Sequence, residues 1–489
     1  MESQADVRPK LKKVTRMVDE FLTELGEMGR NDLDAVALEK QVMEVVCELG
    51  RVLMTAVFRR ADEDAPEVVV NGAQWGSRSV SKGTYVCKFG ETSLHRSGYQ
   101  QSGRGRVLFP LDLRLGIVEG RYTPGVVRVM AHGIAVMPAE EAEGFLAEVG
   151  VVTLSKSTFH RIPQDMSAVY ERHRAEIEAV VRGESRVPEG TRTVQVGMDG
   201  VMVAMDGEHT KPRGRKTDTP AAPRHERHYG AAPAGPAASD DKGGAAYHEA
   251  SVGTVSYFDV KGECLETVYF ARMPEYRKEA LAASLEEELK LVVAEHPDIQ
   301  VALASDGALT HWEHLSGMQE RLPDEVKTRS RQLLDFCHGA KYLFDAAKLV
   351  HGDTADATVV AEGWRSNLRH RQDGPDIVIR SLRYHRDDVA SRADTREELD
   401  TIVDFFVDHR KHGRLAYKAA ANDAFPIGTG TTEAAAKTVV NVRMKRSGAR
   451  YESHGGQTIL NFRTAVLSKR FDLVMRELVS RYSAKVLAA

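Results

Sequence analysis

The chain has few cysteines, and none are arranged in the patterns that build small scaffolds. Its 489 residues include only Cys47, Cys87, Cys264 and Cys337, and no two of them form a Cys-x-x-Cys pair. This spacing argues against a disulfide framework and against a zinc ribbon. We therefore expect a protein of a reducing compartment.

Long apolar runs are also missing. No stretch approaches the roughly 18 residues that a membrane-spanning helix requires. The first residues, MESQADVRPKLKK, contain no apolar segment of the kind found in secretory signals. These absences predict a cytoplasmic protein.

The sequence has no excess of positive charge. It has 67 basic and 71 acidic residues and a formal net charge of −4, which does not by itself indicate a nucleic-acid-binding protein. The balance is uneven, however, because the residues from Lys341 onward include 25 basic and 19 acidic side chains. A basic C-terminal part is compatible with DNA binding at one face.

The length predicts two to four domains, since single hydrophobic cores rarely extend over so many residues. The pattern along the chain indicates an α/β protein, in which three N-terminal modules precede a catalytic core. We expect these regions: a helical hairpin for dimerisation or DNA binding (1–62), a small β-rich module (63–124), a helix-turn-helix region (125–185), the first part of the core (190–345), a helical insertion (346–420), and the C-terminal part of the core with a basic tail (421–489).

Two of the N-terminal modules have recognisable local patterns. The short pieces VVVNG, GTYVCKF and GRVLFPLDL are β-prone and alternate with Gly and Ser turns. Farther on, MPAEEAEGFLAEVG predicts an amphipathic helix, and a second helix is expected to begin near Ser155. This second helix would present Lys156, Ser157, His160 and Arg161 outward to DNA, although a plain helical hairpin explains the pattern equally well.

The core begins with the apolar run TVQVGMDGVMVAM and continues after a Pro-, Gly- and Ala-rich stretch, 207–248, which predicts a mobile insertion in a hairpin loop. The expected order of elements is β-β-β-α-β-α-β-α. This is the order of an RNase H-like mixed sheet, in which one carboxylate comes from the first strand and another from the strand after the first helix.

Asp199 and Asp306 occupy these two positions. Each follows an apolar run and precedes a glycine, which leaves space for a turn, a phosphate or a metal. Asp-Gly is also a common hairpin turn, so a single such pair is weak evidence. Asp206 follows Asp199 by seven residues, which would place it on the opposite face of the same strand.

Glu433 is the third candidate carboxylate. It follows a segment rich in glycine and threonine and opens an alanine-rich helix, where a glutamate also complements the helix dipole. The helix is expected to continue into a basic run that follows DNA phosphates, and this run includes Arg443, Lys445, Arg446 and Arg450.

The block PIGTGTTEAAAKTVVNVRMKRSGARY resembles the Glu-containing block of bacterial insertion-sequence transposases of the ISKra/ISAzba type. MDGVMV and LASDGA resemble the two Asp motifs of this family, LLDFCHGAKYLFDAAKLV its Asp-x-x-His segment, and FPLDLRLGI its N-terminal region. The resemblance covers most of residues 85–470. One departure is that no Cys-x-x-Cys precedes FPLD, where family members commonly have one.

The resemblance implies that Asp199, Asp306 and Glu433 bind two Mg²⁺ ions, with Mn²⁺ able to substitute. It also places His338 near the site, although a buried structural histidine is as good an interpretation. In the insertion, Trp364 is expected either to stack on a base or, more in keeping with its type, to lie in the core.

These expectations together predict a DNA transposase that binds transposon ends, cleaves a strand and joins a 3′-hydroxyl to target DNA. Its partners would be double-stranded DNA and further copies of the chain, as a homodimer or higher oligomer, at the bacterial nucleoid. Two alternatives stay open: a domesticated DNA-binding regulator that has lost catalysis, and an RNase H-like nuclease.

Overall fold

The structure is a computed structural model, and it describes residues 7–101, 105–206, 246–388 and 393–489. Most of the expected insertion at 207–248 therefore lies outside the described residues. The chain forms two compact units, Met1–Ile177 with Phe471–Ala489, and Glu178–Arg470. No helix in the described ranges is both long and apolar enough to cross a membrane.

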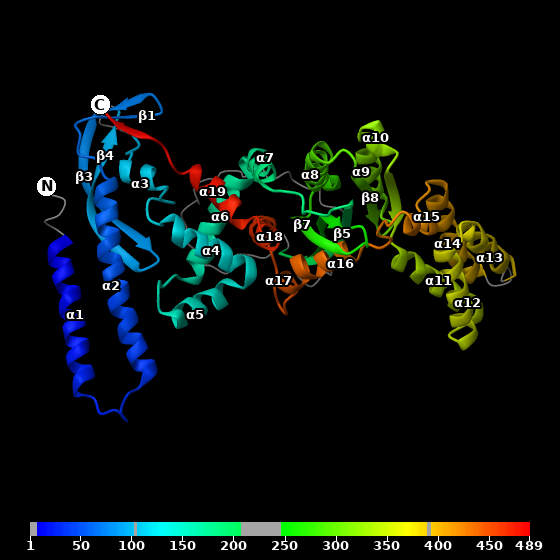
Figure 1. Cartoon of the computed structure of the whole chain (residues 1–489), viewed down its shortest axis with the longest axis horizontal. Coiled ribbons are helices and arrows are strands. Elements are labelled where there is room, and N and C mark those ends of the chain that lie inside the picture. Colours follow the sequence, from blue (N-terminus) through cyan, green and yellow to red (C-terminus); the bar gives the residue numbers. More distant parts are fainter. Residues whose placement is uncertain (1–6, 102–104, 207–245, 389–392) are drawn as a thin grey trace, which may run out of the picture. The chain divides into compact units, whose positions relative to one another are not determined.

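The first unit begins with an antiparallel pair of long helices, α1 (Val7–Glu27) and α2 (Ala35–Ala61). Asp34 caps α2, because its carboxylate accepts hydrogen bonds from the backbone N–H groups of Val36 and Ala37. Figure 1 shows the two helices side by side. The expected helical hairpin is present.

Short strands follow the hairpin and form two small sheets. β3 (Ser77–Cys87) pairs with β4 (Gly90–Gln100), and β1 (Val68–Val70) pairs with β2 (Ala73–Trp75) on one side and with β10 (Val486–Ala488) on the other. The C-terminal strand thus belongs to the N-terminal unit, whereas the sequence grouped 421–489 as one region. The β-prone assignment of GRVLFPLDL is wrong over its last residues, because Pro110 starts the short helix α3 (Pro110–Leu115).

Helices fill the rest of the first unit. α4 (Pro124–Val136) and α5 (Ala139–Val149) both contact α6 (Lys156–Arg172), and α5 ends at Gly150 in the left-handed conformation. Ser155 caps α6 through a bond from the N–H of Thr158. α7 (Arg174–Glu184) leads into the second unit, and α19 (Phe471–Ser480) belongs to the first.

The second unit contains a five-stranded mixed sheet in the order β7-β6-β5-β8-β9. β5 (Thr193–Met205) is the central strand; it pairs antiparallel with β6 (Ala246–Phe258) and parallel with β8 (Gln300–Ser305). β7 (Cys264–Arg272) and β9 (Ser330–Leu334) form the edges. The protein is therefore of the mixed α/β class.

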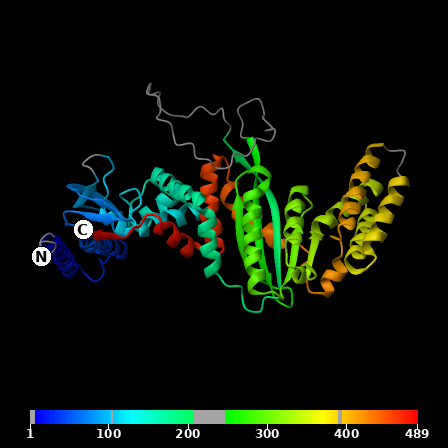
Figure 2. The same ribbon diagram turned by 90° about the horizontal axis from the view of Figure 1, so that it is seen from above.

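Helices cover both faces of this sheet. One face, with Val194, Val196 and Met198 of β5, packs against α8 (Glu279–Glu295) and α9 (Leu309–Glu320). The other face packs against three segments of the C-terminal region, α16 (Gly430–Ala435), the π-helical η3 (Ala436–Asn441) and α18 (Ser453–Leu467). Figure 2 shows the sheet from a direction at right angles to that of Figure 1. The short helices η2 (Tyr276–Lys278), α10 (Asp324–Lys327) and α17 (Val442–Met444) complete this part.

A second core in this unit is helical. It is formed by α11 (Phe336–His351), α12 (Ala355–His370), α13 (Gly374–Asp388), α14 (Ala393–Lys411) and α15 (Tyr417–Asn422). The sequence placed the start of this helical region at residue 346. In the structure this helical region begins ten residues earlier, at Phe336, because Phe336 and Leu343 of α11 belong to the same core.

A buried ion pair ties α8 to the segment that follows α18. Arg470 donates to both carboxylate oxygens of Glu288, at 2.9 and 2.5 Å, and the Glu288 side chain is only 2% exposed. Removing one member leaves the other as an uncompensated buried charge. Glu288→Ala is therefore expected to lower the free energy of unfolding by about 3–5 kcal/mol in urea titrations.

Glu287→Ala is the matched control, because Glu287 pairs with Lys290 on the exposed side of the same helix. Its expected effect is below about 1 kcal/mol. Equal losses in the two variants would contradict the role given to the buried pair.

Candidate active site

Asp199 of β5 and Asp306, which directly follows the adjacent parallel strand β8, are neighbours. Met198 of β5 pairs with Ser305, the last residue of β8, and an aspartate follows each of them. Side chains alternate along strands, so Asp199 lies opposite the face that carries Met198, and Asp306 is close enough for its charge to act on the pKa of Asp199. The sheet register brings together the two carboxylates that the sequence predicted.

The two carboxylates have different electrostatic surroundings. Burial, followed by the nearby charge of Asp306, raises the pKa of Asp199, although its Oδ1 accepts a 2.7 Å bond from the N–H of Gly200. For Asp306 burial also acts to raise the pKa, but hydrogen bonding to His311 and to the N–H of Ala308 outweighs it and holds the pKa below its usual value. Two like charges are thus held close together in a partly desolvated site, which is a suitable environment for a divalent cation.

His311 supports Asp306 from the first turn of α9. Its side chain is 2% exposed, and its Nδ1 lies 2.9 Å from Ser305 Oγ and 3.5 Å from Asp306 Oδ1. Lys278 Nζ lies 2.7 Å from the other ring nitrogen and also pairs with Glu249. Since an ammonium group can only donate, Nε2 accepts and Nδ1 carries the proton that points toward Ser305 and Asp306.

Glu433 is positioned by the close packing of α16 on β5. A Cβ at Gly197 would lie 2.0 Å from Thr432 Oγ1, so only glycine allows this approach. Thr432 Oγ1 also forms a 2.7 Å bond with Thr254 Oγ1 of β6. Gly197 and Asp199 lie on the same face of β5. Thr432, which packs on Gly197, therefore lies near Asp199, and Glu433 is the next residue along the chain.

Asp335 connects the Glu433 segment to the helical core. Its carboxylate is buried and accepts bonds from Thr429 N (2.5 Å), Thr429 Oγ1 (2.8 Å) and His338 N (2.6 Å). One oxygen caps α11, and the other holds the loop from which α16 begins. Asp335 is thus a positioning residue for Glu433.

His338 lies on the first turn of α11. Its ring is partly exposed and packs edge-on against Tyr342. It is also close enough to Asp306 for its charge to act on the pKa of that carboxyl. The structure therefore brings His338 to the side of the candidate site.

Three metal-binding side chains do not converge in this conformation. Among the described residues, no group of three or more His, Cys, Asp and Glu side chains is arranged to hold a metal ion. The Glu433 carboxylate instead accepts a 2.8 Å bond from Lys437, one turn later, and is 62% exposed. The structure thus brings Asp199 and Asp306 together, whereas Glu433 is engaged by Lys437.

The residues predicted to bind DNA on α6 are all exposed. Lys156 pairs with Glu140 at 2.7 Å, Arg161 with Glu119 at 2.6 Å, and Ser157 Oγ lies 3.0 Å from Ser155 Oγ. His160 is also on the exposed side. The helix thus presents the predicted side chains to solvent, with its two cations engaged by local carboxylates.

The predicted basic run after Glu433 differs from expectation in two respects. Arg443 is only 4% exposed, so its guanidinium is not available to phosphates. The helix also ends at Met444, and Lys445, Arg446 and Arg450 follow it as exposed residues of a loop that returns to β5 through the Tyr451–Met205 bridge. The glycine at position 448 has a positive φ that the end of this turn requires.

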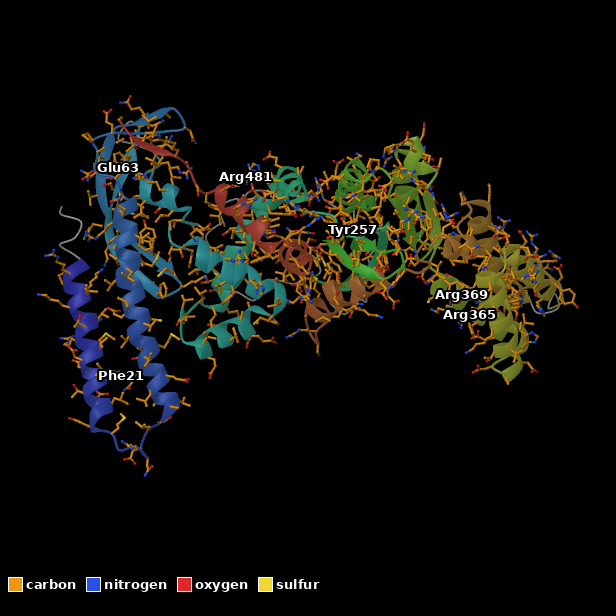
Figure 3. All side chains as sticks on the ribbon, in the orientation of Figure 1. Phe21, Glu63, Tyr257, Arg365, Arg369 and Arg481 are labelled. Carbon is orange, nitrogen blue, oxygen red and sulfur yellow. The ribbon has the colours of Figure 1, made fainter. Side chains whose placement is uncertain are left out.

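In the helical core, Trp364 is buried and donates to Ser381 Oγ at 2.9 Å, which makes it a core residue. Arg365 and Arg369 lie on the same helix, α12, and both are labelled in Figure 3. Their charges and that of Glu433 all act on the Cys337 thiol at the start of α11. Two arginines of the helical core therefore lie on the same side of this unit as Glu433.

Sequence reasoning missed two members of the site, His311 and Lys278. The sequence could have indicated His311, since it follows Asp306 by five residues at the first turn of the next helix. No sequence pattern indicated Lys278, because its contact with His311 depends on the left-handed backbone that starts α8.

Comparisons with known proteins add no identification. Neither the known protein families nor the curated proteins contain a match to this chain. The assignment of a function therefore depends on the residues and their arrangement.

The raised pKa of Asp199 has a consequence for stability. Because the folded protein disfavours the ionised form, protonated Asp199 contributes to the stability of the fold. This contribution is complete below the pKa of Asp199 in the unfolded chain, ordinarily 3.8, and is lost as the pH rises through its pKa in the folded protein. Asp199→Asn cannot ionise and is therefore expected to melt about 2 °C higher than the wild type at pH 7. Thermal melts at pH 7 and pH 3 measure this, and the difference should vanish at pH 3. A lower Tm for Asp199→Asn at pH 7 would contradict the conclusion that burial and the charge of Asp306 make the ionised form of Asp199 destabilising.

Proposed function

We propose that the protein is a DNA transposase with an RNase H-like core, resembling the ISKra/ISAzba-type enzymes of bacterial insertion sequences. The observation that carries the proposal is the proximity of Asp199, on the central strand β5, to Asp306, at the end of the adjacent parallel strand β8. The strand order β7-β6-β5-β8-β9, with only β6 antiparallel to both neighbours, supports the RNase H-like assignment.

The donor set is appropriate for Mg²⁺ or Mn²⁺. Carboxylate oxygens are the ligands that these hard cations prefer, and the mutual repulsion of Asp199 and Asp306 is relieved when a cation binds. In this proposal Asp199, Asp306 and Glu433 hold two ions. The ions, when bound, supply the charge that activates a water or 3′-hydroxyl and stabilises the leaving oxygen of a phosphodiester.

The chain's own residues orient this site. His311 holds Asp306 ionised by donating toward it, while Lys278 fixes the tautomer of that histidine. Asp335 and Gly197 place α16 so that Glu433 lies over the same face as Asp199. His338, beside Asp306, can position a water or the scissile phosphate.

DNA binding is proposed for exposed basic residues in each unit. In the second unit, Arg365 and Arg369 lie on the side of Glu433, and Lys445, Arg446 and Arg450 follow the helix that carries it. In the first unit, Lys156, Ser157, His160 and Arg161 of α6 would contact DNA ends once Lys156 and Arg161 exchange their carboxylate partners for phosphates.

Metal binding can be tested without measuring catalysis. Mg²⁺ at millimolar concentration is expected to raise the Tm of the wild type by several degrees, because ligand binding to the folded state stabilises it. Asp306→Asn should show little of this increase. Equal Mg²⁺-dependent shifts in the two proteins would place the cation elsewhere.

The same preparation separates the nuclease alternative from the transposase. A transposase should cleave duplex DNA that carries the ends of its own element and leave an RNA–DNA hybrid intact. Cleavage of the hybrid alone would support an RNase H-like nuclease instead. Specific end binding without Mg²⁺-dependent cleavage would favour a catalytically silent regulator.

A further inference from the structure

The α1–α2 hairpin exposes one continuous apolar face. On α2 large apolar side chains are exposed at 3-4 spacing over about four turns, and on α1 three are exposed on one side, seven and four residues apart. The members of this face, here called the hairpin face, are Leu11, Val18 and Leu22 of α1 and Val42, Val46, Leu49, Leu53 and Val57 of α2.

The two rows lie on the same side of the hairpin. Lys13 of α1 bonds to Glu48 of α2, and Gln41 of α2 bonds to Glu24 of α1, so these residues mark the sides on which the two helices face each other. Met17 and Phe21 of α1, and Val45 and Val52 of α2, lie on these sides by their 3-4 spacing and are less exposed than the rows themselves. Figure 3 labels Phe21 on α1, where this helix runs beside α2. In each helix the exposed apolar residues come one position after residues that face the other helix, which corresponds to a rotation of about 100°. Because the helices are antiparallel, these two rotations point to the same side.

Charge is separated along the length of the hairpin. Its open end, residues 8–16 and 49–60, has eight basic and no acidic side chains. Its turn end, residues 19–48, has nine acidic and two basic side chains. A second hairpin placed antiparallel on the first would therefore align each basic end with an acidic end, whereas a parallel one would align like charges.

We propose that the hairpin face binds the same face of a second copy of this chain, in antiparallel orientation, to form a four-helix bundle. The apolar face supplies the buried seam and the charge separation selects the orientation. The assignment does not depend on the catalytic proposal, since it rests only on residues 8–60.

Disulfide crosslinking in the full chain tests both the partner and its orientation. The exposed cysteines are first removed as Cys264→Ser and Cys337→Ser. Leu49 is near the middle of the α2 row, so Leu49→Cys is expected to form a disulfide-linked dimer on mild oxidation. Val57→Cys alone should not crosslink, but it should do so when mixed with Val42→Cys.

Sedimentation measures the association directly. The wild type is expected to sediment as a dimer at micromolar concentration, and Val46→Glu with Leu53→Glu should shift it to a monomer. Val80→Glu, at another exposed apolar residue of the same unit, is the control and should leave the dimer intact. Efficient self-crosslinking of Val57→Cys, no crosslinking of Leu49→Cys, or a monomeric wild type would each overturn the proposal.

Discussion

Replacing Asp199 or Asp306 by Asn, or Glu433 by Gln, is expected to reduce Mg²⁺-dependent DNA strand cleavage by at least ~100-fold. Loss of outer-shell partners alone typically lowers metal affinity or activity by about 10–100-fold, and the loss of a direct ligand should exceed that. Each replacement keeps the size of the side chain and removes its charge. The assay is cleavage of a labelled duplex that carries the ends of the element, with purified protein.

Two controls make this prediction specific. Binding to the same duplex should stay within about twofold of the wild type, because the replacements remove only negative charge and leave in place every basic residue proposed to hold DNA. Asp206→Asn should retain cleavage, since Asp206 is exposed and bonds to Tyr451 through its backbone N–H, which the substitution leaves in place. Full cleavage in any of the three site variants would remove that residue from the proposed site.

Asp335→Ala is expected to lower both stability and activity, although Asp335 bonds to His338, Thr429 and Ser305 and not to the two aspartates of the site. The substitution removes the cap of α11 and the two bonds to Thr429. Bonds to a buried carboxylate contribute about 1.5–3 kcal/mol each at most, so a total loss of about 3 kcal/mol is expected in urea unfolding. Glu433 would also lose the anchor that places its helix over β5.

A structural effect and a positioning effect can be separated in this case. Asp335→Asn retains one acceptor and should recover most of the stability but only part of the cleavage activity. Asp345→Ala, on the exposed side of α11, should leave both quantities unchanged. Wild-type cleavage by a folded Asp335→Ala protein would show that the contact does not position Glu433.

Local patterns in the sequence predicted the elements that carry the two aspartates. The alternating run TVQVGMDGVMVAM forms β5, and the continuous apolar run before Asp306 forms β8, as strand periodicity indicates. The α1–α2 hairpin and the start of α6 at Ser155 were likewise visible, because helical spacing and caps are local signals. The β-prone interpretation of FPLDL was wrong, since proline at the first helical position outweighed the apolar run.

The arrangement of the site required contacts between distant parts of the chain. Gly197 with Thr432 and Asp335 with Thr429 join segments that are 235 and 94 residues apart, and no periodic pattern encodes such pairs. The burial of Arg443 has a different, local cause. The π-helical turns of η3 after Glu433 change the helical phase, so that a residue expected on the outer face faces inward.

The most direct test of the proposed two-metal site is to count bound Mn²⁺ ions by electron paramagnetic resonance. The wild type is expected to bind two Mn²⁺ ions per chain. A variant that combines Asp199→Asn, Asp306→Asn and Glu433→Gln should bind none at the same concentrations, while its circular dichroism spectrum stays unchanged. Equal Mn²⁺ binding by the two proteins, or none by the wild type, would contradict the account.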